Sequence, residues 1–562
     1  MRRSREEQRR SRRFHPHFPS ASMADFLSLS KSSKNSILTL IVFVLAFDLA
    51  FVGQKLGGAY QNEFGGHPHE ASHYMAGLFW RDLAVSIRRD RAEGKREPLS
   101  EAKRSFTQNW DAHYPYLETG SERSLFHGLE AVWMLAFPAT RGSLLVLLAV
   151  ISGVLATQLY RVLHHKYGWA GAALAAAALL ALPSVRKFTG LVMPDILSSV
   201  LIFGAAIAFG DFLDREKARD AWLAGLLGGL AILNSESSFV VWMVMLLAFV
   251  MMRKLRLLRR AALWGMCVLI VAASVLRFGL SRGHVIEVAL PGGGFAYQTE
   301  LHSRVSSADL IPVWSALGWG LAVLMLIGLF VKMRREGDFA GRWLAAGALL
   351  VGSILSRSSL PALPAALMFA LAGGAWLVQW VAARPAWHGQ GAKVRVGFPA
   401  LLGALLLLSA VGPLKREPCT GFAPLVETLI ADSAPEDVTL VSSDASGEER
   451  FIAELAMRET WPGHRVLCGT RLLANPGKKF IADEPAFMGD QAVFDFLTSG
   501  RIKYIALDDA IPDEERREHH YQMERAIEEH LNRFWAIANS PMTRDGVTQT
   551  TPARLYKIKG VQ

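Results

Sequence analysis

The amino-acid sequence predicts a polytopic α-helical membrane protein with a smaller α/β domain outside the membrane. The chain has 562 residues, of which 51% are hydrophobic, and its mean hydropathy is +0.23. Runs of Leu, Ala and Val recur at lengths of roughly 17 to 22 residues, which is the length that a helix needs to cross a bilayer. From residue 415 onward, short apolar runs instead alternate with charged helical ones, as they do in α/β domains.

About eleven apolar segments are expected to span the membrane. A long outer loop, residues 54–141, separates the first span from the second, and most of the other outer loops are short. Residues 36–414 are therefore expected to form the transmembrane domain. The predicted spans cover residues 36–53, 142–160, 169–185, 193–212, 221–233, 237–252, 261–278, 310–331, 343–355, 360–382 and 396–411.

The distribution of Lys and Arg predicts the orientation, because basic side chains near the ends of spans resist translocation. Residues 1–35 form a strongly basic tail that we expect to be cytoplasmic and disordered. The segment 415–562 then lies on the opposite side of a bacterial inner membrane, outside the cytoplasm. The net charge of +11 does not indicate nucleic-acid binding, because the basic residues gather at span ends without a nucleic-acid motif. The clusters on the side of the tail cover residues 161–166, 253–260, 332–335 and 384–395.

The segment 415–562 is predicted to be a small α/β domain. It contains no G-x-G-x-x-G sequence and no phosphate-binding loop, so nucleotide binding has little support. The turn from Ser442 to Gly447 could hold an anion at a helix start, but an ordinary strand-to-helix turn with an N-cap is the more frequent explanation. We expect strands at residues 438–443, 465–468 and 504–507, and helices at residues 448–458, 491–499 and 514–535.

The chain has three cysteines. Cys267 falls within a predicted span, where packing is its expected role. Cys419 and Cys468 fall in the outer segment, where an oxidising compartment would permit a disulfide, and the sequence leaves their pairing open. No Cys-x-x-Cys pair exists, so a cysteine-based zinc site is not expected.

Residues 65–74 read GGHPHEASHY and match the HExxH pattern of zinc peptidases. Pro68 could begin a helix, on which His69 and His73 would share one face. A zinc peptidase also needs a third protein ligand and a glutamate that activates the zinc-bound water. Glu70 could supply the glutamate, but no acidic residue downstream clearly supplies the third ligand. The pattern thus leaves open a metal site with His69 and His73 as ligands.

Three segments carry a resemblance to a known family. They read GGHPHEASHYMAGLFWRD at residues 65–82, FTGLVMPD at residues 188–195 and SSLPALP at residues 358–364. They resemble the first outer loop, the second acidic loop and an Arg-Tyr-Leu-Leu-Pro-Ala-Leu-Pro segment of the GT-C superfamily of membrane glycosyltransferases. The similar members are bacterial proteins related to the dolichyl-phosphate-mannose protein mannosyltransferases and the lipid A aminoarabinose transferases. The resemblance covers most of the membrane region and implies a GT-C-like fold.

The chain departs from the family pattern at three places. His69 stands where the family has an aspartate before the glutamate, and this one difference creates the HExxH pattern. After His113 the family continues toward Gly-His-Trp-Pro-Pro, whereas residues 118–124 read ETGSERS. Asn234 begins an Asn-Ser-Glu sequence at the place of an expected Lys-Gly pair. These departures concern the catalytic competence of the chain and leave the fold prediction intact.

The resemblance implies transfer of a sugar from a polyprenyl-phosphate donor to a glycan, lipid or protein acceptor outside the cytoplasm. Inverting transfer needs a carboxylate that takes the proton of the acceptor, and basic groups that neutralise the departing lipid phosphate. On this basis we expect Glu70 to be the general base and Asp195 to be the second acid. The expected substrate contacts are Arg186, Lys187, Arg357 and His113.

Two other functions stay open at this point: a membrane zinc metallopeptidase, or a catalytically inactive scaffold with a GT-C fold. A peptidase would lose its activity in His69→Ala, whereas a transferase could tolerate that change but not Glu70→Gln, and a scaffold would tolerate both. A transporter is not favoured, because the sequence shows no internal repeat and no paired broken spans. The expected partners are the lipid-linked sugar, its acceptor and membrane lipids, and a divalent metal ion is the one cofactor considered.

Overall fold

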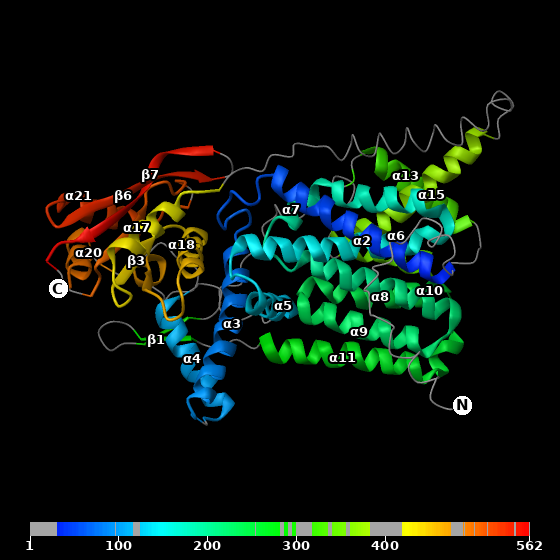
Figure 1. The fold of residues 1–562 in the computed structure, drawn as a ribbon, viewed down its shortest axis with the longest axis horizontal. Coiled ribbons are helices and arrows are strands. Elements are labelled where there is room, and N and C mark those ends of the chain that lie inside the picture. Colours follow the sequence, from blue (N-terminus) through cyan, green and yellow to red (C-terminus); the bar gives the residue numbers. More distant parts are fainter. Residues whose placement is uncertain are drawn as a thin grey trace, which may run out of the picture.

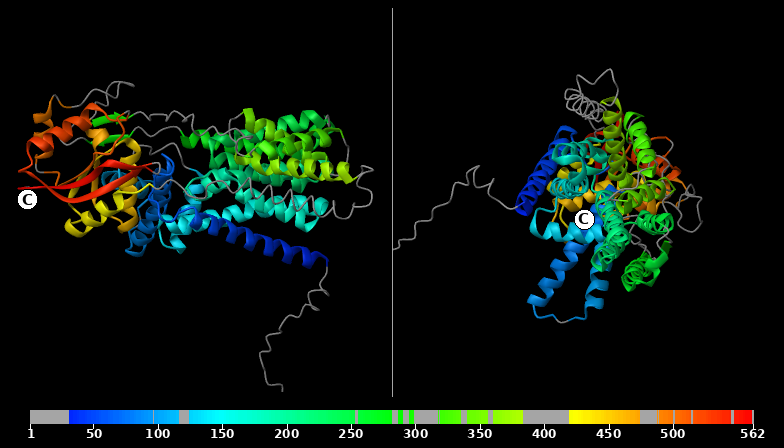
Figure 2. Two further views of the ribbon diagram at one scale, coloured as in Figure 1. Left: turned by 90° about the horizontal axis from the view of Figure 1, so that it is seen from above. Right: turned by 90° about the vertical axis from the view of Figure 1, so that its right-hand side faces the viewer.

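The structure is a computed structural model of the chain. A bundle of long helices forms one end of the molecule and a sheet with its covering helices forms the other (Figure 1), with the outer-loop helices between them. The two further views show the same division (Figure 2). The residues described are 31–95, 97–115, 124–252, 255–281, 286–289, 295–298, 317, 319–334, 340–355, 360–382, 419–473, 487, 489–499, 501–513, 515–544 and 547–560.

The bundle consists of apolar helices whose outer faces carry large hydrophobic side chains. Leu45, Val275 and Trp319 are 62%, 65% and 83% exposed, which a helix in water would avoid but a helix in lipid does not. The bundle helices are α2 (Lys31–Leu56), α6 (Arg141–Ala181), α8 (Asp195–Arg215), α9 (Ala218–Asn234), α10 (Val240–Met252), α11 (Ala261–Ser281), α13 (Trp319–Arg334), α14 (Ala340–Leu355) and α15 (Leu363–Ala382). Short helical segments accompany them: α7 (Pro183–Thr189) and the 3-10 turns η2 (Glu236–Phe239), η3 (Leu255–Arg259) and η5 (Leu360–Ala362).

The described part of the chain does not confirm the expected count of eleven membrane spans. Among the described residues, four helices are long and apolar enough to cross a bilayer, at Asn35–Leu56, Arg141–Ala181, Asp195–Arg215 and Leu360–Val381. Several other apolar helices are shorter, so the count of eleven is not confirmed. The span expected at residues 396–411 lies outside the described part of the chain.

Helix α6 contains the second and third predicted spans, and Gly168 separates them. The backbone of Gly168 has φ 73° and ψ 175°, which interrupts the helix at a position where any residue with a Cβ would be strained. The second part ends at Leu182, where Pro183 begins α7. The sequence prediction of separate segments at residues 142–160 and 169–185 therefore agrees with the backbone.

The first outer loop folds into three helices. They are α3 (Glu70–Ala92), α4 (Leu99–His113) and α5 (Leu125–Ala136). Helices α3 and α4 form a hairpin that projects from the body of the molecule (Figure 2). Trp110 on α4 is fully buried, and its ring lies 4.9 Å from that of Trp461 in the C-terminal segment. The outer loop therefore shares its core with the C-terminal segment.

The C-terminal segment forms a five-stranded sheet of order β4-β3-β5-β7-β6. The first three pair in parallel and the last two are antiparallel, with Leu440 facing Leu467 on one side and Ile505 on the other. Every residue of β5 is buried, as is usual for a central parallel strand. The strands are β3 (Val438–Ser442), β4 (Arg465–Cys468), β5 (Tyr504–Asp508), β6 (Phe534–Arg544) and β7 (Val547–Ile558), and the helices are α17 (Phe422–Asp432), α18 (Ala445–Arg458), α19 (Gly469–Leu472), α20 (Asp490–Leu497) and α21 (Glu518–Glu529). A two-stranded ribbon, β1 (Ile286–Ala289) with β2 (Phe295–Gln298), lies apart from this sheet in the sequence.

The structure answers three expectations about the C-terminal segment. The helix expected through residue 535 is wrong at its end, because α21 stops at Glu529 and the chain then enters β6. The turn after β3 is the expected strand-to-helix turn, since Asp444 caps α18 by accepting a hydrogen bond from the Gly447 N–H. Cys419 and Cys468 are both buried, and they do not form a disulfide.

Glu63 joins the outer loop to the C-terminal segment. Its Oε1 accepts hydrogen bonds from the N–H groups of Gly421 and Ala423 at 2.8 and 2.9 Å. Its Oε2 accepts one from the Phe422 N–H at 3.0 Å. These donors are the unpaired groups at the start of α17, where a negative charge also meets the positive end of the helix dipole. The outer loop therefore supplies the N-terminal cap of a helix more than 300 residues further along the chain.

Burial makes Glu448 on α18 a source of pH-dependent stability. Its side chain is fully buried, it accepts hydrogen bonds from the Thr470 N–H and hydroxyl, and burial raises its pKa to about 8. Between pH ~4.5 and ~8 the folded protein keeps this proton while the unfolded chain loses it, so stability falls as pH rises through this window. We expect Glu448→Gln to flatten that part of the stability profile, measured by thermal unfolding of the purified chain at a series of pH values.

The control for this prediction is Glu427→Gln on α17, where the side chain is 68% exposed. We expect this variant to keep the slope of the parent protein. An unchanged slope in Glu448→Gln would contradict the assignment of the proton to Glu448.

Candidate active site

Glu70 is the first residue of α3 and forms a buried ion pair with Arg141, the first residue of α6. The Arg141 Nη2 and Nε atoms lie 2.8 and 2.9 Å from Glu70 Oε1, and the two side chains are 5% and 0% exposed. The Val192 N–H donates to the same oxygen at 3.1 Å. The N–H groups of Gly65 and Gly66 donate to Oε2 at 3.3 and 3.2 Å. Every oxygen of this carboxylate is thus occupied by donors of the protein itself.

Arg141 extends the same network to three backbone carbonyl groups. Its Nη1 donates to the carbonyl oxygens of Ala59 and Asn62, and its Nη2 donates to that of Gly190 at 3.2 Å. The planar guanidinium can serve these acceptors and the carboxylate together because it carries five N–H donors in a fixed arrangement. The ion pair therefore fixes the outer loop, the start of α6 and the turn before α8 relative to one another.

Within the part of the chain that the structure describes, the HExxH residues are not part of a metal-binding cluster. His69 is the N-cap residue of α3, and His73 lies one turn further along. The described residues include no group of three or more His, Cys, Asp or Glu side chains that could hold a metal ion. Glu70, which would have to activate a zinc-bound water, is instead paired with Arg141. The residues present therefore do not fit a catalytic zinc ion.

His73 makes a different contact, with a histidine on α5. His73 Nδ1 and His127 Nε2 lie 2.9 Å apart. His127 Nδ1 accepts a hydrogen bond from the Ser124 N–H at 3.4 Å, so in a neutral ring Nε2 carries the proton and donates it to His73. Burial, together with the nearby His69 and His67, lowers the pKa of His73 to about 3. His73 is therefore a neutral imidazole at physiological pH.

Asn234 connects this histidine pair to Asp195. Its Oδ1 accepts a hydrogen bond from the Phe126 N–H at the start of α5 at 2.9 Å. Its Nδ2 donates to the Pro194 carbonyl at 3.1 Å and to the Ser198 hydroxyl at 2.8 Å. Asp195, the first residue of α8, follows Pro194 directly and is half-buried. The start of α5, the start of α8 and the end of α9 therefore meet at one place.

The expected substrate-binding residues fall into two groups. Arg186 is half-buried and Lys187 is exposed on α7, and the helix ends at Thr189 directly before Gly190, an acceptor of Arg141. His113 lies elsewhere, at the end of α4, with its ring 5.1 Å from that of Trp461. Burial lowers the pKa of His113, whose Nδ1 bonds to the Asn109 carbonyl at 2.8 Å. Arg357 lies outside the described residues.

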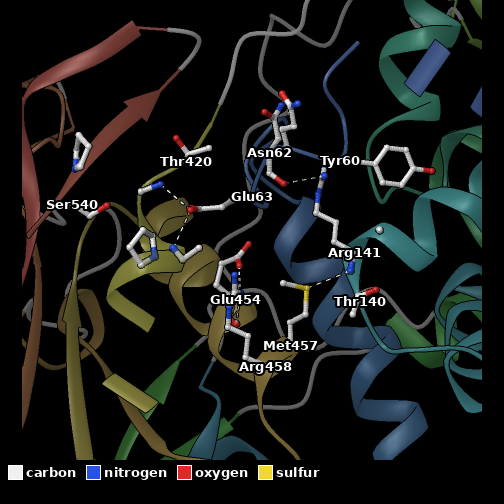
Figure 3. A pocket seen from close by; sticks show the side chains of 16 residues that line it. Tyr60, Asn62, Glu63, Thr140, Arg141, Thr420, Glu454, Met457, Arg458 and Ser540 are labelled. Atoms are coloured by element: carbon white, nitrogen blue, oxygen red, sulfur yellow. Dashed lines mark hydrogen bonds and ion pairs between the residues drawn. The ribbon is translucent and has the colours of Figure 1, made fainter. Parts of the chain in front are cut away.

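A cavity of about 540 Å³ lies between the outer loop and the C-terminal segment (Figure 3). In this view Glu63 points toward the start of α17, and Glu454 and Arg458 lie together on α18. Arg141 borders the same space from the side of the bundle. The volume of this cavity is within the range of small-molecule sites, and the hydroxyl, amide and charged groups that line it could hold a polar ligand. The lining also includes Tyr60, Asn62, Thr140, Thr420 and Ser540.

Sequence reasoning missed the partners that decide what the expected residues do. Arg141 was visible in the sequence as a charged residue directly before the apolar segment 142–160. A charge at the edge of a membrane span often has a functional or structural role. His127 and Glu130 were visible as polar residues one turn apart in the otherwise apolar helix α5. Glu130 is fully buried, and neither of its carboxyl oxygens has a hydrogen-bond partner in the described part of the chain. No local pattern indicated their contacts, which join segments far apart in the sequence.

No protein-family model matches the chain, and no curated protein matches its sequence. Solved structures do match. ArnT from Cupriavidus metallidurans, crystallised with undecaprenyl phosphate, is 14% identical with a TM-score of 0.50, and the match covers 95% of this chain and 99% of that one. The apo form of ArnT is 13% identical with a TM-score of 0.51, covering 94% and 98%. The archaeal oligosaccharyltransferase AglB from Archaeoglobus fulgidus, in complex with an inhibitory peptide and a dolichol-phosphate, is 13% identical with a TM-score of 0.46, covering 85% and 70%. The likeness to ArnT, over nearly the whole of both chains, shows that the chain shares the fold of that protein, as the resemblance to the aminoarabinose transferases implied.

Removal of one partner of the Glu70–Arg141 pair is expected to destabilise the protein strongly. Arg141→Met leaves a buried carboxylate without its counter-charge, which typically costs about 3–5 kcal/mol. We therefore expect a large drop in the unfolding temperature in detergent. In the double variant Glu70→Gln with Arg141→Met, the loss should be smaller than the sum of the single losses, because removing both charges leaves no unpaired charge in the buried site.

The matched control is Arg256→Met, which breaks the pair with Glu216 at the bundle end, where the arginine side chain is 72% exposed. An exposed pair contributes about 0–1 kcal/mol, so little change in the unfolding temperature is expected. Equal losses in Arg141→Met and Arg256→Met would contradict the structural role given to the buried pair.

Proposed function

We propose that the chain is a membrane glycosyltransferase that moves a sugar from a polyprenyl-phosphate donor to an acceptor outside the cytoplasm. The observation that supports this proposal most is the shared fold over nearly the whole of ArnT, which was crystallised with undecaprenyl phosphate. The outer-loop and second-loop motifs that suggested the family also meet in space, through Glu70, Arg141 and the turn at Gly190 to Val192.

The proposed transfer needs three tasks from the protein. A carboxylate takes the proton of the acceptor hydroxyl while the hydroxyl oxygen attacks the anomeric carbon of the sugar. The bond between that carbon and the phosphate oxygen breaks, and the polyprenyl phosphate leaves with the bonding electrons. Basic groups neutralise this phosphate, a task that we assign to Arg186 and Lys187.

Burial leads us to divide the acid roles differently from the sequence expectation. Both oxygens of Glu70 already accept hydrogen bonds, so it would have to release Arg141 before it could accept a proton from a substrate. We therefore propose that Glu70 positions the outer loop and that Asp195, half-buried at the start of α8, is the base. His69, half-buried at the place of the family aspartate, is a neighbouring group for which we assign no proton transfer.

A second candidate function is a non-catalytic scaffold with the same fold. Two observations favour it: His69 replaces the aspartate of the family pattern, and the adjacent Glu70 is fully engaged in the ion pair. The zinc peptidase is less favoured than either, because the same ion pair occupies the glutamate that a peptidase would need.

We further propose that the protein lies in a bacterial inner membrane with its N-terminus in the cytoplasm and its C-terminal sheet outside. Basic side chains lie at the bundle end away from the sheet. Lys166 and Lys332 both lie over the ring of Trp343 there, at 5.7 and 4.5 Å, and Arg256 pairs with Glu216 after α8. This accumulation supports a cytoplasmic position for that end.

The proposal predicts sugar transfer that depends on Asp195. Membranes containing the chain would be incubated with a panel of radiolabelled polyprenyl-phosphate sugars and the labelled acceptor measured. We expect Asp195→Asn to lower transfer by at least about 100-fold, since general-base catalysis contributes 10²–10⁴-fold. A parallel sample with EDTA shows whether a divalent metal ion takes part in the transfer.

The control for this assay is Asp495→Asn, an exposed carboxylate on α20 that should leave transfer unchanged. Transfer that survives in Asp195→Asn would place the base elsewhere. If the folded protein transfers sugar from none of the donors, the result would support the scaffold. If the protein shows proteolysis that is lost in His69→Ala, the result would support the zinc peptidase.

A further inference from the structure

A second cavity lies within the bundle. The helix segments that line it lie at the end of the bundle opposite the C-terminal sheet, and Figure 1 shows the arrangement of these helices. The cavity has a volume of about 670 Å³, and it is lined by residues of α2, α6, α8 and α9 together with Arg342 of α14. No residue assigned above to sugar transfer lines it: Glu70 belongs to α3, which does not line the cavity, and Asp195 begins α8, whose second half does. The proposed function therefore leaves this cavity unexplained.

The mouth of the cavity is basic. Arg161, His164 and His165 line it from the middle of α6, and the Arg161 side chain is exposed. The one acid among the lining residues is Asp211, which Arg342 neutralises through two hydrogen bonds, one of them 2.6 Å long. The charge of Arg161 is therefore not balanced by an acid of the lining, and the cavity attracts an anion.

The less exposed part of the lining includes apolar side chains and adjoins the lipid-facing surface. Phe203 of α8 is buried, and Ile207 of α8 and Leu227 of α9 are half-buried. Leu40 on α2 and Leu226 on α9, each beside lining residues in the sequence, are 62% and 51% exposed on the outer face of the bundle. A ligand with an anionic head and a hydrocarbon chain fits this division between a basic mouth and an apolar interior, whereas a fully polar anion would leave the apolar part unused.

Two buried polar atoms in the lining also lack protein partners. The Tyr160 hydroxyl and Gln158 Oε1 have no hydrogen-bond partner among the described residues. Tyr160 is only 2% exposed. A buried polar group without a partner is costly and rare in folded proteins, so these two atoms are candidates for hydrogen bonds to a polar group that binds in the cavity.

We propose that this cavity binds the phosphate of an anionic phospholipid from the surrounding leaflet. Arg161 pairs with the phosphodiester, the Tyr160 hydroxyl and the His164 ring donate hydrogen bonds to the headgroup, and an acyl chain lies along Phe203 and Leu227. Basic pockets between membrane helices are known to select such headgroups. The site is independent of sugar transfer and would exist equally in a scaffold.

The test is lipid retention by the full chain, measured by native mass spectrometry after purification in detergent. Phosphatidylglycerol, phosphatidylcholine and inorganic phosphate would be added separately. We expect phosphatidylglycerol to be retained in preference to phosphatidylcholine, and Arg161→Gln to weaken its retention about fivefold, the factor that one basic residue near a headgroup typically contributes. Tyr160→Phe, which removes a single oxygen atom, should weaken retention to a smaller extent.

The matched control is Arg259→Gln, an exposed basic residue in η3 at the same end of the bundle that does not line the cavity. It should retain phosphatidylglycerol like the parent protein. The proposal would be overturned by equal retention of both phospholipids, by an equal loss in Arg259→Gln, or by displacement of phosphatidylglycerol with inorganic phosphate, which would indicate a site for free anions. Unfolding temperatures without added lipid verify that each variant is folded.

Discussion

The arrangement of the outer site depends on one buried charge pair, Glu70 with Arg141. Taking two charges out of water is costly, and the cost is offset only when the geometry is close and the remaining donors and acceptors are satisfied. Here the carboxylate accepts three backbone hydrogen bonds besides its contacts with the arginine, and the guanidinium donates to three carbonyl groups. Because these groups come from three separate segments, the pair can be satisfied only when all three segments are in place. The two charges therefore find all of their hydrogen-bond partners only when the site is assembled.

The same constraint explains why a short motif predicts a site poorly. Two imidazoles four residues apart, with a glutamate between them, meet the spacing of a zinc peptidase, and the helix that this spacing requires is present. What the spacing leaves undetermined is the partner of each side chain. Glu70 pairs with an arginine and His73 contacts His127, so the glutamate and the second histidine of the motif belong to two different networks.

Much of the fold could be predicted from the sequence, because length and apolarity alone indicate membrane helices and the break at Gly168 appears as a gap between two apolar runs. The parallel strands β3, β4 and β5 were also predictable, since each is a short apolar run between helices. The β6–β7 hairpin was missed, because charged residues up to position 533 continue the helical pattern and the strands carry many polar residues. The site was least predictable: Glu70 and Asp195 were found, but the arginine that decides the role of Glu70 lies 71 residues away, and only the fold brings it near.

Glu63 and Glu70 stand seven residues apart on one short stretch of chain and hold two different parts of the molecule. Glu63 holds the first turn of α17, and Glu70 holds the first turn of α6. With the buried contact of Trp110 and Trp461 beside them, these attachments leave the outer loop little freedom to slide against the C-terminal sheet. The loop, the sheet and the start of α6 are thus expected to move as one rigid body. Any rearrangement that admits a substrate would then have its hinge within the helical bundle, and not at the boundary between membrane and outer segment, where domain motion is usually sought.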